Sequence, residues 1–395
     1  MKRHLIGIGG VGMSALAVVL KRLGDEVTGA DRTLGTPNVK FLESMGIAVF
    51  PDDGSGVDGS VDEVIVSTAI EETNKGLIKA KELGIPITHR AKALARALSG
   101  KKLVAVAGTC GKSTVTAMLG HILIACGKEP LCVNGANVPG WEGAVNFGRG
   151  EYAVAEVDES DKSLTAFKPY AVIITNASAD HYSKEEMDEV FDNFIKDVIG
   201  PIVDARGEVY RPQDYNLQNM SLALRMAEKL GIAREEAELA MRSFGGVERR
   251  LQKIGEKVYD DYAHNPEKLR SMWMTMAEKH PEGICVIWRP HGYGPLKKMM
   301  EALADMFNEV IRPQDRLLLL PVYDAGGTAF RGINSGDLAE KLREGSCEMV
   351  ADIEGAFRWA QAHYGEFGAI ITCGARDPEL PRLAKRLAEV NSSPR

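Results

Sequence analysis

The sequence predicts an α/β protein of three domains: an N-terminal Rossmann-like domain, a central P-loop ATPase-like domain and a C-terminal Rossmann-like domain. Three observations lead to this prediction. A glycine-rich turn opens a helix near the N-terminus, a glycine loop with lysine and serine follows an apolar run at residue 108, and a third series of strands and helices begins after Gly245-Gly246. Strands that alternate with helices are typical of parallel sheets. The expected boundaries are 1–99, 100–245 and 246–395.

The bulk composition is that of an ordinary globular chain. It has 395 residues, 45% of them hydrophobic and 26% charged, and a net charge of −7, which disfavours a nucleic-acid partner. Its six cysteines form no close C-x-x-C pair, which argues against a zinc cluster and suits a reducing compartment. No apolar run is long enough to cross a bilayer. We therefore expect a cytoplasmic monomer or homodimer that binds small molecules, with neither nucleic acid nor membrane as a partner.

The first domain begins with a strand, a glycine turn and a helix. His4 to Ile8 is the predicted strand, Gly7 to Gly12 reads G-x-G-x-x-G and opens a helix to Leu23, and the next strand ends at Asp31. An acidic residue about 20 positions after such a turn is typical of NAD binding. Taken alone, the motif indicates only a bound diphosphate or a close contact between helix and strand, so a nicotinamide dinucleotide remains an alternative.

The central domain begins with a phosphate-binding loop. An apolar strand from Leu103 leads into Gly108-Thr-Cys-Gly-Lys-Ser113, and Val115 to Cys126 is the predicted helix. Glycines let the backbone fold around an anion, the lysine supplies a mobile positive charge, and the serine hydroxyl can bind the Mg²⁺ that accompanies ATP. Val106 stands where the strict motif has its first glycine, so an ordinary glycine-containing turn is the alternative.

Two further strands of the central domain end in polar residues. The strand from Tyr152 ends in a run of acids that includes Glu156 and Asp158, and the strand from Ala171 leads to His181. The carboxyl ends of parallel strands meet at one edge of a sheet, which would bring these groups beside the phosphate loop. Oxygen ligands suit Mg²⁺, so a metal–nucleotide site is expected. The alternatives are a solvated acidic loop and a histidine at a helix start.

The third domain carries two polar clusters. Arg249-Arg250 lies just past the Gly245-Gly246 linker, where it could reach phosphate groups, and Asp260-Asp-Tyr-Ala-His-Asn-Pro266 follows a predicted strand. Further strands are expected near 284–288, 316–321 and 369–372. We expect the loop after Asp260 to face the same cleft as the arginine pair.

In this order the motifs resemble those of the Mur ligase family, and most closely the members that join UDP-N-acetylmuramate to L-alanine. The resemblance covers nearly the whole chain and disfavours the nicotinamide alternative. The segments that carry it are 7–17, 67–70, 85–91, 108–114, 156–161, 175–181, 216–219, 249–250 and 260–266.

The resemblance implies an ATP-dependent amide-forming ligase of peptidoglycan precursor synthesis. A substrate carboxylate would attack the γ-phosphate of ATP to give an acyl phosphate, and an amine would then displace phosphate. The first step brings the negatively charged carboxylate and phosphate groups together, so catalysis would depend on positioning and electrostatic stabilisation. The substrates would be a UDP-sugar carboxylate and an amino acid or peptide amine. The family's domains close over their substrates, which makes the Gly245-Gly246 linker an expected hinge.

The resemblance also assigns roles to single residues. It implies catalytic roles for Lys112, Arg250 and His291, and metal-binding roles for Ser113, Glu156 and His181. The implied UDP-substrate residues are Gly9, Gly10, Val11, Gly12, Asp31 and Ser67. The implied ATP-binding residues are Gly108, Thr109, Gly111, Lys112, Ser113, Thr114, Asn219, Arg249, Arg250 and Asp260, with Asn219 near the adenine and Asp260 near the ribose.

The sequence departs from the family pattern mainly in its second half. Only 34 residues separate His181 from Asn216, so the central domain is shortened. Pro290-His-Gly-Tyr-Gly-Pro295 lacks both arginines that the family uses in its acceptor loop. Cys110, Asp52-Asp53-Gly54 and Asp324-Ala-Gly-Gly-Thr328 are further differences. These changes keep two alternatives open: a ligase with a different amine or carboxylate, and a non-catalytic paralogue that only binds nucleotide.

Overall fold

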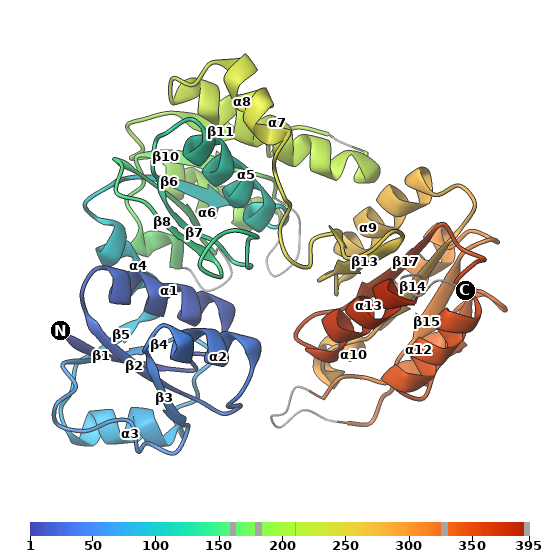
Figure 1. The fold of residues 1–395 in the computed structure, drawn as a ribbon, viewed down its shortest axis with the longest axis horizontal. Helices are drawn as coiled ribbons and strands as arrows, with labels where there is room; N and C mark the ends of the chain where they lie inside the picture. Colours follow the sequence, from blue (N-terminus) through green and yellow to red (C-terminus); the bar gives the residue numbers. More distant parts are fainter. Residues whose placement is uncertain (159–162, 178–183, 210, 325–330, 391–395) are drawn as a thin grey trace. The chain divides into compact units, whose positions relative to one another are not determined.

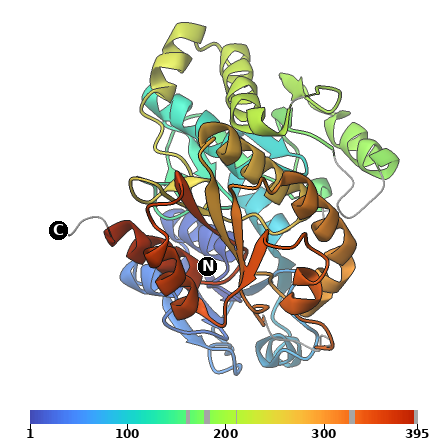
Figure 2. The ribbon, with the colours of Figure 1, turned by 90° about the vertical axis from the view of Figure 1, so that its right-hand side faces the viewer.

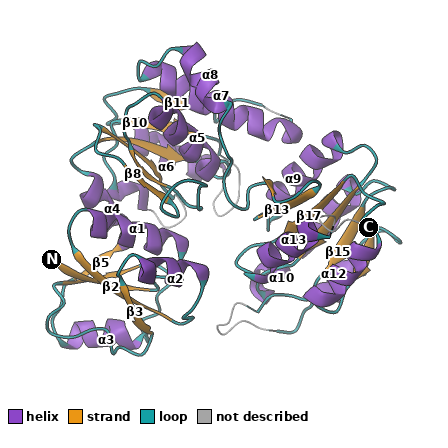
Figure 3. Cartoon of the chain, viewed as in Figure 1, coloured by secondary structure: helices purple, strands orange, loops and turns teal. Residues whose placement is uncertain are grey.

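The computed structural model describes residues 1–158, 163–177, 184–209, 211–324 and 331–390. The chain forms three sheets and divides into two compact units (Figure 1). The first unit, 1–209 with 218–247, holds the first two sheets, and the second, 210–217 with 248–395, holds the third. Helices and strands alternate along most of the chain, as predicted (Figure 3).

The first sheet has five parallel strands in the order β3-β2-β1-β4-β5. Its strands are β1 (Lys2–Ile6), β2 (Glu26–Asp31), β3 (Ala48–Pro51), β4 (Glu63–Val66) and β5 (Ile87–His89), and its helices are α1 (Val11–Arg22), α2 (Pro37–Ser44), α3 (Lys75–Glu82) and α4 (Arg90–Leu98). One face packs against α3, and the other against α1, α2 and α4. Parallel strands covered on both faces bury apolar side chains on both sides, as β1 does with Leu5 and Ile6.

The second sheet has the order β11-β10-β6-β9-β7-β8, and only β8 is antiparallel to its neighbour. Its strands are β6 (Lys102–Ala107), β7 (Leu131–Val133), β8 (Val145–Phe147), β9 (Tyr152–Glu156), β10 (Ala171–Ile174) and β11 (Ile202–Asp204). Its helices are α5 (Lys112–Ala125), the short η1 (Ser163–Ala166), α6 (Lys184–Ile195), α7 (Tyr215–Lys229) and α8 (Arg234–Met241).

The first two sheets share one hydrophobic core. Along β6, Val104 and Val106 face α5, α7 and α8, whereas Leu103, Ala105 and Ala107 face the other way. That second face packs with α6 and also belongs to the cluster that contains α1 and α4. Arg22 of α1 also pairs with Glu142, with Nε 2.9 Å from Oε2. Continuous burial of this kind explains why the first two sheets form one unit.

The third sheet has the order β12-β13-β17-β14-β15-β16, and only β12 is antiparallel. Its strands are β12 (Gln252–Lys253), β13 (Val258–Asp261), β14 (Ile284–Trp288), β15 (Arg316–Leu319), β16 (Cys347–Met349) and β17 (Ala369–Cys373). Its helices are α9 (Pro266–Lys279), α10 (Tyr293–Val310), α11 (Ser335–Ala339), α12 (Ile353–Ala362) and α13 (Glu379–Glu389); the short η2 (Pro212–Asp214) packs on α9. Helices α9 and α10 cover one face, and α12 and α13 the other. Figure 2 shows the red C-terminal helix α13 and the orange-brown helices on opposite sides of these strands.

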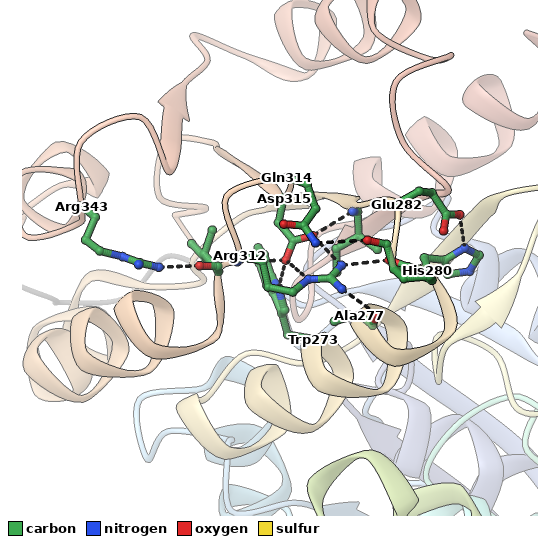
Figure 4. Close-up of polar contacts among 11 residues, drawn as sticks. Trp273, Ala277, His280, Glu282, Arg312, Gln314, Asp315 and Arg343 are labelled. Carbon is green, nitrogen blue, oxygen red and sulfur yellow. Dashed lines mark hydrogen bonds and ion pairs between the residues drawn. The ribbon is translucent and has the colours of Figure 1, made fainter.

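A polar cluster supports the amino-terminal edge of this third sheet (Figure 4). Asp315, fully buried, accepts hydrogen bonds from Trp273 Nε1 and from the backbone N–H of Ile284, both at 3.0 Å. Arg312 pairs with Asp315 and donates to the carbonyl oxygens of Ala277 and His280 at 2.8 and 2.9 Å. The guanidinium therefore satisfies carbonyl groups that the end of α9 leaves without helical partners.

Among the described residues, no helix is both long and apolar enough to cross a membrane.

Candidate functional site

The predicted UDP-substrate residues lie together at the carboxyl edge of the first sheet. Gly10 is the N-cap of α1, so Val11 and Gly12 form its first turn. Asp31, at the end of β2, accepts hydrogen bonds from the N–H of Gly9 at 2.8 Å and from that of Thr33 at 2.9 Å. The carboxylate of Asp31 therefore holds the glycine turn in shape.

Residues from two neighbouring segments lie against this glycine turn. Ser67 follows β4, and Ile70 from the same loop lies against Gly7. Arg90, the first residue of α4, places its guanidinium against Gly12, because a Cβ on that glycine would stand 3.3 Å from Arg90 Nη1. A cation beside a helix N-terminus suits a diphosphate. The sequence prediction included Arg90 in the segment 85–91 but assigned it no role.

The phosphate loop adopts the predicted conformation between β6 and α5. Gly108 has φ 121° and Gly111, the N-cap of α5, has φ 87°, which are conformations that favour glycine. Lys112 Nζ donates to the carbonyl oxygen of Gly108 at 2.6 Å, so the ammonium group bends back over the loop. Thr109, Ser113 and Thr114 are buried. This arrangement brings the lysine and the first N–H groups of α5 together at the helix N-terminus, which is what a polyphosphate requires.

The residues that follow β10 clamp this loop. The N–H of Cys110 donates to Asn176 Oδ1 at 2.9 Å, and the carbonyl oxygen of Cys110 accepts from Thr175 Oγ1 at 2.5 Å. Asn176 Nδ2 also donates to that carbonyl oxygen at 3.1 Å. These bonds are made by backbone atoms of Cys110, so they do not depend on its side chain. The sequence prediction quoted Asn176 within a motif but gave it no role.

Ser113 and Glu156 meet at the point predicted for the metal. Ser113 Oγ donates to Glu156 Oε2 at 2.7 Å, and the same oxygen accepts from the N–H of Gly135 at 2.9 Å. Glycine is needed at 135, because a Cβ there would collide with the Glu156 carboxylate. A hydroxyl and a carboxylate beside a phosphate loop are hard oxygen donors that fit Mg²⁺, which usually also keeps waters and substrate phosphates as ligands.

The rest of the predicted metal site is only partly described. His181 lies outside the described residues, as do Glu159 and Asp161. Within the described segments, no group of three or more His, Cys, Asp or Glu side chains is placed to hold a metal ion. The described part of the site therefore consists of Ser113 and Glu156.

Asn219, predicted to lie near the adenine, is on α7 and almost completely buried. Among the described residues, its Nδ2 has no hydrogen-bond partner. The adjacent Gln218 donates to the carbonyl oxygen of Thr175 at 3.4 Å, which ties this turn of α7 to the clamp on the phosphate loop. A buried amide donor without a partner costs free energy, and an acceptor nitrogen on a bound base would relieve that cost.

The second unit contains the other predicted ATP-binding residues. Asp260 is 1% exposed, and its two oxygens accept from Arg249 Nε at 2.9 Å and from Thr372 Oγ1 at 2.6 Å. Burial raises its pKa. Arg249 also donates to the carbonyl oxygen of Gly374 at 2.5 Å. In this structure Asp260 therefore fixes Arg249, and its contact with ribose stays a prediction.

Arg250 and Asp261 lie beside this pair. Asp261 accepts hydrogen bonds from the N–H groups of Leu251 and Ala263, both at 2.7 Å, and burial raises its pKa. The guanidinium carbons of Arg249 and Arg250 stand 5.1 and 5.2 Å from the centre of the Tyr262 ring. Such cation–π contacts orient an arginine while leaving its N–H groups available to an anion.

His291 follows β14 and packs against His264, which follows β13. Their ring centres are 5.0 Å apart in an edge-to-face arrangement. Burial lowers the pKa of His264 to about 4, and burial together with the charge of Arg376 lowers the pKa of His291. Both rings are therefore neutral at pH 7, and a neutral imidazole can accept a proton.

Comparison with known proteins defines the family. The model of the Mur ligase family, catalytic domain, matches residues 2–102, and that of the Mur ligase, glutamate ligase domain, matches residues 249–376. The UDP-N-acetylmuramate–L-alanine ligase of Rubrobacter xylanophilus is 32% identical over 440 residues, covering 95% of this chain and 97% of the relative. The chain belongs to the Mur ligase family. Membership confirms the predicted class, an ATP-dependent amide-forming ligase that acts on small molecules.

Other Mur ligases agree in sequence and in fold. The ligase of the same name from Sinorhizobium medicae is 28% identical over 464 residues, covering 99% of this chain and 98% of the relative. That alignment is longer than the 395 residues of this chain, so this Mur ligase lacks segments that its relative has. The crystal structure of the UDP-N-acetylmuramate–alanine ligase from Thermotoga maritima superimposes with a TM-score of 0.82 at 24% identity, covering 98% of each chain. The likeness confirms the predicted three-domain α/β fold.

Proposed function

We propose that this Mur ligase joins the carboxylate of UDP-N-acetylmuramate to the amino group of L-alanine in the synthesis of a peptidoglycan precursor, using ATP and Mg²⁺. The substrates are those named for its full-length relatives. The observation that carries the chemistry is the phosphate loop, where Lys112 bends over Gly108 and Ser113 is hydrogen-bonded to Glu156 at the end of β9. We further propose a cytoplasmic location, because ATP is cytoplasmic and the six cysteines are free, and we keep the expectation of a monomer or homodimer.

In the first step the sugar carboxylate attacks the γ-phosphate of ATP. Lys112 and the first N–H groups of α5 hold the phosphates, and Asn219 offers its unpartnered Nδ2 to the adenine. Ser113 and Glu156 would hold Mg²⁺, which neutralises charge that develops on the phosphate oxygens. His181 remains a predicted third ligand. The glycine turn before α1, with Arg90 beside it, would receive the UDP diphosphate.

In the second step the amine of L-alanine displaces phosphate from the acyl phosphate. Arg249 and Arg250, held by Asp260 and by the ring of Tyr262, present cations to the phosphoryl group, first as it moves from ATP to the carboxylate and then as it leaves as phosphate. His291 is neutral and lies at the same edge of the third sheet, so it can accept the proton that the amine loses as it attacks. Asp260 contributes by holding Arg249 in position.

The test is phosphate release from ATP and Mg²⁺, with UDP-N-acetylmuramate present or absent and with amino acids added singly. We expect release to need both UDP-N-acetylmuramate and L-alanine, and mass spectrometry to show the amide. Lys112→Ala should abolish release and leave the fold intact, whereas Lys128→Ala, an exposed lysine after α5, should leave the rate unchanged. If phosphate release needs an amine other than L-alanine, that amine is the acceptor in place of L-alanine. ATP binding without turnover with any pair would favour the non-catalytic paralogue.

A further inference from the structure

Arg376 lies at the centre of the carboxyl edge of the third sheet. It follows β17 by three residues, and Cys373 at the end of β17 is paired with Asp261 of β13 on one side and with Trp288 of β14 on the other. Three residues beyond those partners are His264 and His291. Because the three strands are parallel, their following loops leave the same edge, and the loop that carries Arg376 begins between the two that carry the histidines.

The backbone of Arg376 is strained. It has φ 61°, in the left-handed region that favours glycine. The turn is held in this shape by Asp377, fully buried, which pairs with Arg289 at 2.9 Å and accepts the N–H of Glu379 at 2.8 Å. Glycine would fit this position without strain. Strained non-glycine residues concentrate at binding and catalytic sites, where the side chain compensates for the conformation.

The guanidinium of Arg376 is available to a ligand. Arg249, Arg289 and Arg331 of the same unit are each paired with an aspartate. Arg376 is exposed and, within the described part of the chain, makes no hydrogen bond or ion pair. Its charge nevertheless acts on His291 and contributes to the lowered pKa of that imidazole. An exposed cation and a neutral imidazole thus follow two paired strands at the same edge of the sheet, and no carboxylate among the described residues is paired with the cation.

We propose that Arg376 binds the carboxylate of the acceptor amino acid while His291 lies beside its amine. This inference rests on the proposed ligase function and assigns the acceptor to the class of free α-amino acids. An α-amino acid carries its carboxylate one carbon from its amine, so a guanidinium next to a neutral imidazole matches both groups. The segment Gly292-Tyr293-Gly294-Pro295, which follows His291 and begins α10, supplies no cation of its own.

The test uses the full-length enzyme and the variant Arg376→Gly. Glycine accepts the left-handed backbone, so this variant should melt no lower than the wild type, and lost activity would not reflect misfolding. We expect the KM for L-alanine to rise about 10- to 100-fold, which corresponds to losing a hydrogen bond to a charged group, while the KM for ATP stays within about twofold. Arg376→Lys should recover part of the loss. Arg358→Ala, which removes an exposed arginine from α12, should change neither constant.

Hydroxylamine separates this proposal from the proposed function. It has no carboxylate, and it can attack an acyl phosphate to release phosphate and form a hydroxamate. Wild type and Arg376→Gly should form hydroxamate from UDP-N-acetylmuramate and ATP at similar rates. The assignment of Arg376 would be overturned if Arg376→Gly left the KM for L-alanine unchanged, or if it raised the KM for ATP and not that for L-alanine. The ligase function would stand in either case. No hydroxamate and no amide from the wild type would overturn the ligase function, and this proposal with it.

Discussion

Ser113 Oγ donates a 2.7 Å hydrogen bond to Glu156 Oε2, joining the first turn of α5 to the carboxyl end of β9. The two residues are 43 positions apart, and pairing of β6 with β9 brings them together. The bond orients both oxygens beside the phosphate loop before any nucleotide is present. Preorganised ligands of this kind reduce the cost of binding a metal–nucleotide complex.

Glu156→Gln should lower the rate of phosphate release by about 100-fold or more, because an amide keeps the shape of the side chain but loses the charge that a metal ligand needs. The measurement is the rate as a function of Mg²⁺ concentration, and the midpoint should move to higher Mg²⁺. The matched control is Glu151→Gln, just before the same strand, where the exposed carboxylate pairs with Lys102. A normal Mg²⁺ midpoint in Glu156→Gln would refute the assignment.

Gly135→Ala should impair the same site without touching a charged group. The added Cβ would collide with the Glu156 carboxylate and displace it from Ser113. We therefore expect a raised Mg²⁺ midpoint in the phosphate-release assay, similar in direction to that of Glu156→Gln. Gly100→Ala is the control, since no atom lies within 4 Å of a Cβ at that position. If both variants behave alike, the close approach at Gly135 has no part in metal binding.

The stability of the first unit should fall with acidification through His4. Burial lowers the pKa of His4 to about 4 from 6.5, so between those values the unfolded chain binds a proton that the folded chain excludes. The free energy of unfolding therefore rises with pH in this window, and up to about 3 kcal/mol is lost between pH 7 and pH 4.

Urea unfolding at pH 7 and pH 5 measures this effect. The variant His4→Asn keeps a polar group near Thr28 Oγ1, which lies 2.9 Å from His4 Nδ1, but it has no titration in the window. Its stability should change less between the two pH values than that of the wild type. Equal changes in both proteins would assign the acid sensitivity to other groups.

Arg312→Leu should destabilise the second unit by about 3 kcal/mol, because it leaves the buried charge of Asp315 without its partner and the end of α9 without its cap. Asp315 is fully buried in the cluster of Figure 4. Urea or guanidinium unfolding measures the loss. Arg270→Ala removes an arginine from α9 whose partner, Glu309, is 63% exposed, and should cost under about 1 kcal/mol. Comparable losses would show that the cluster contributes no more than a surface pair.

The sequence determined the elements that have strong local signals. The phosphate loop was predicted from Gly108 to Ser113, and the helix expected from Val115 begins at Lys112, because Gly111 in the left-handed conformation can cap it directly. The first strand was expected to reach Ile8 but ends at Ile6, since Gly7 turns the chain at φ 75°. Short strands such as β3 and β8 were not predicted, because three or four residues carry too little periodicity to stand out.

The tertiary structure decided which distant groups meet. Gly135 follows the short strand β7. Nothing in the sequence indicates that the Glu156 carboxylate packs against it. Arg376 looks like an ordinary loop residue until β17 is placed between β13 and β14. The shared core of the first two sheets is likewise invisible in the sequence. Local patterns report backbone conformation and burial, whereas strand order arises from packing between segments far apart in the chain, and that order places the site.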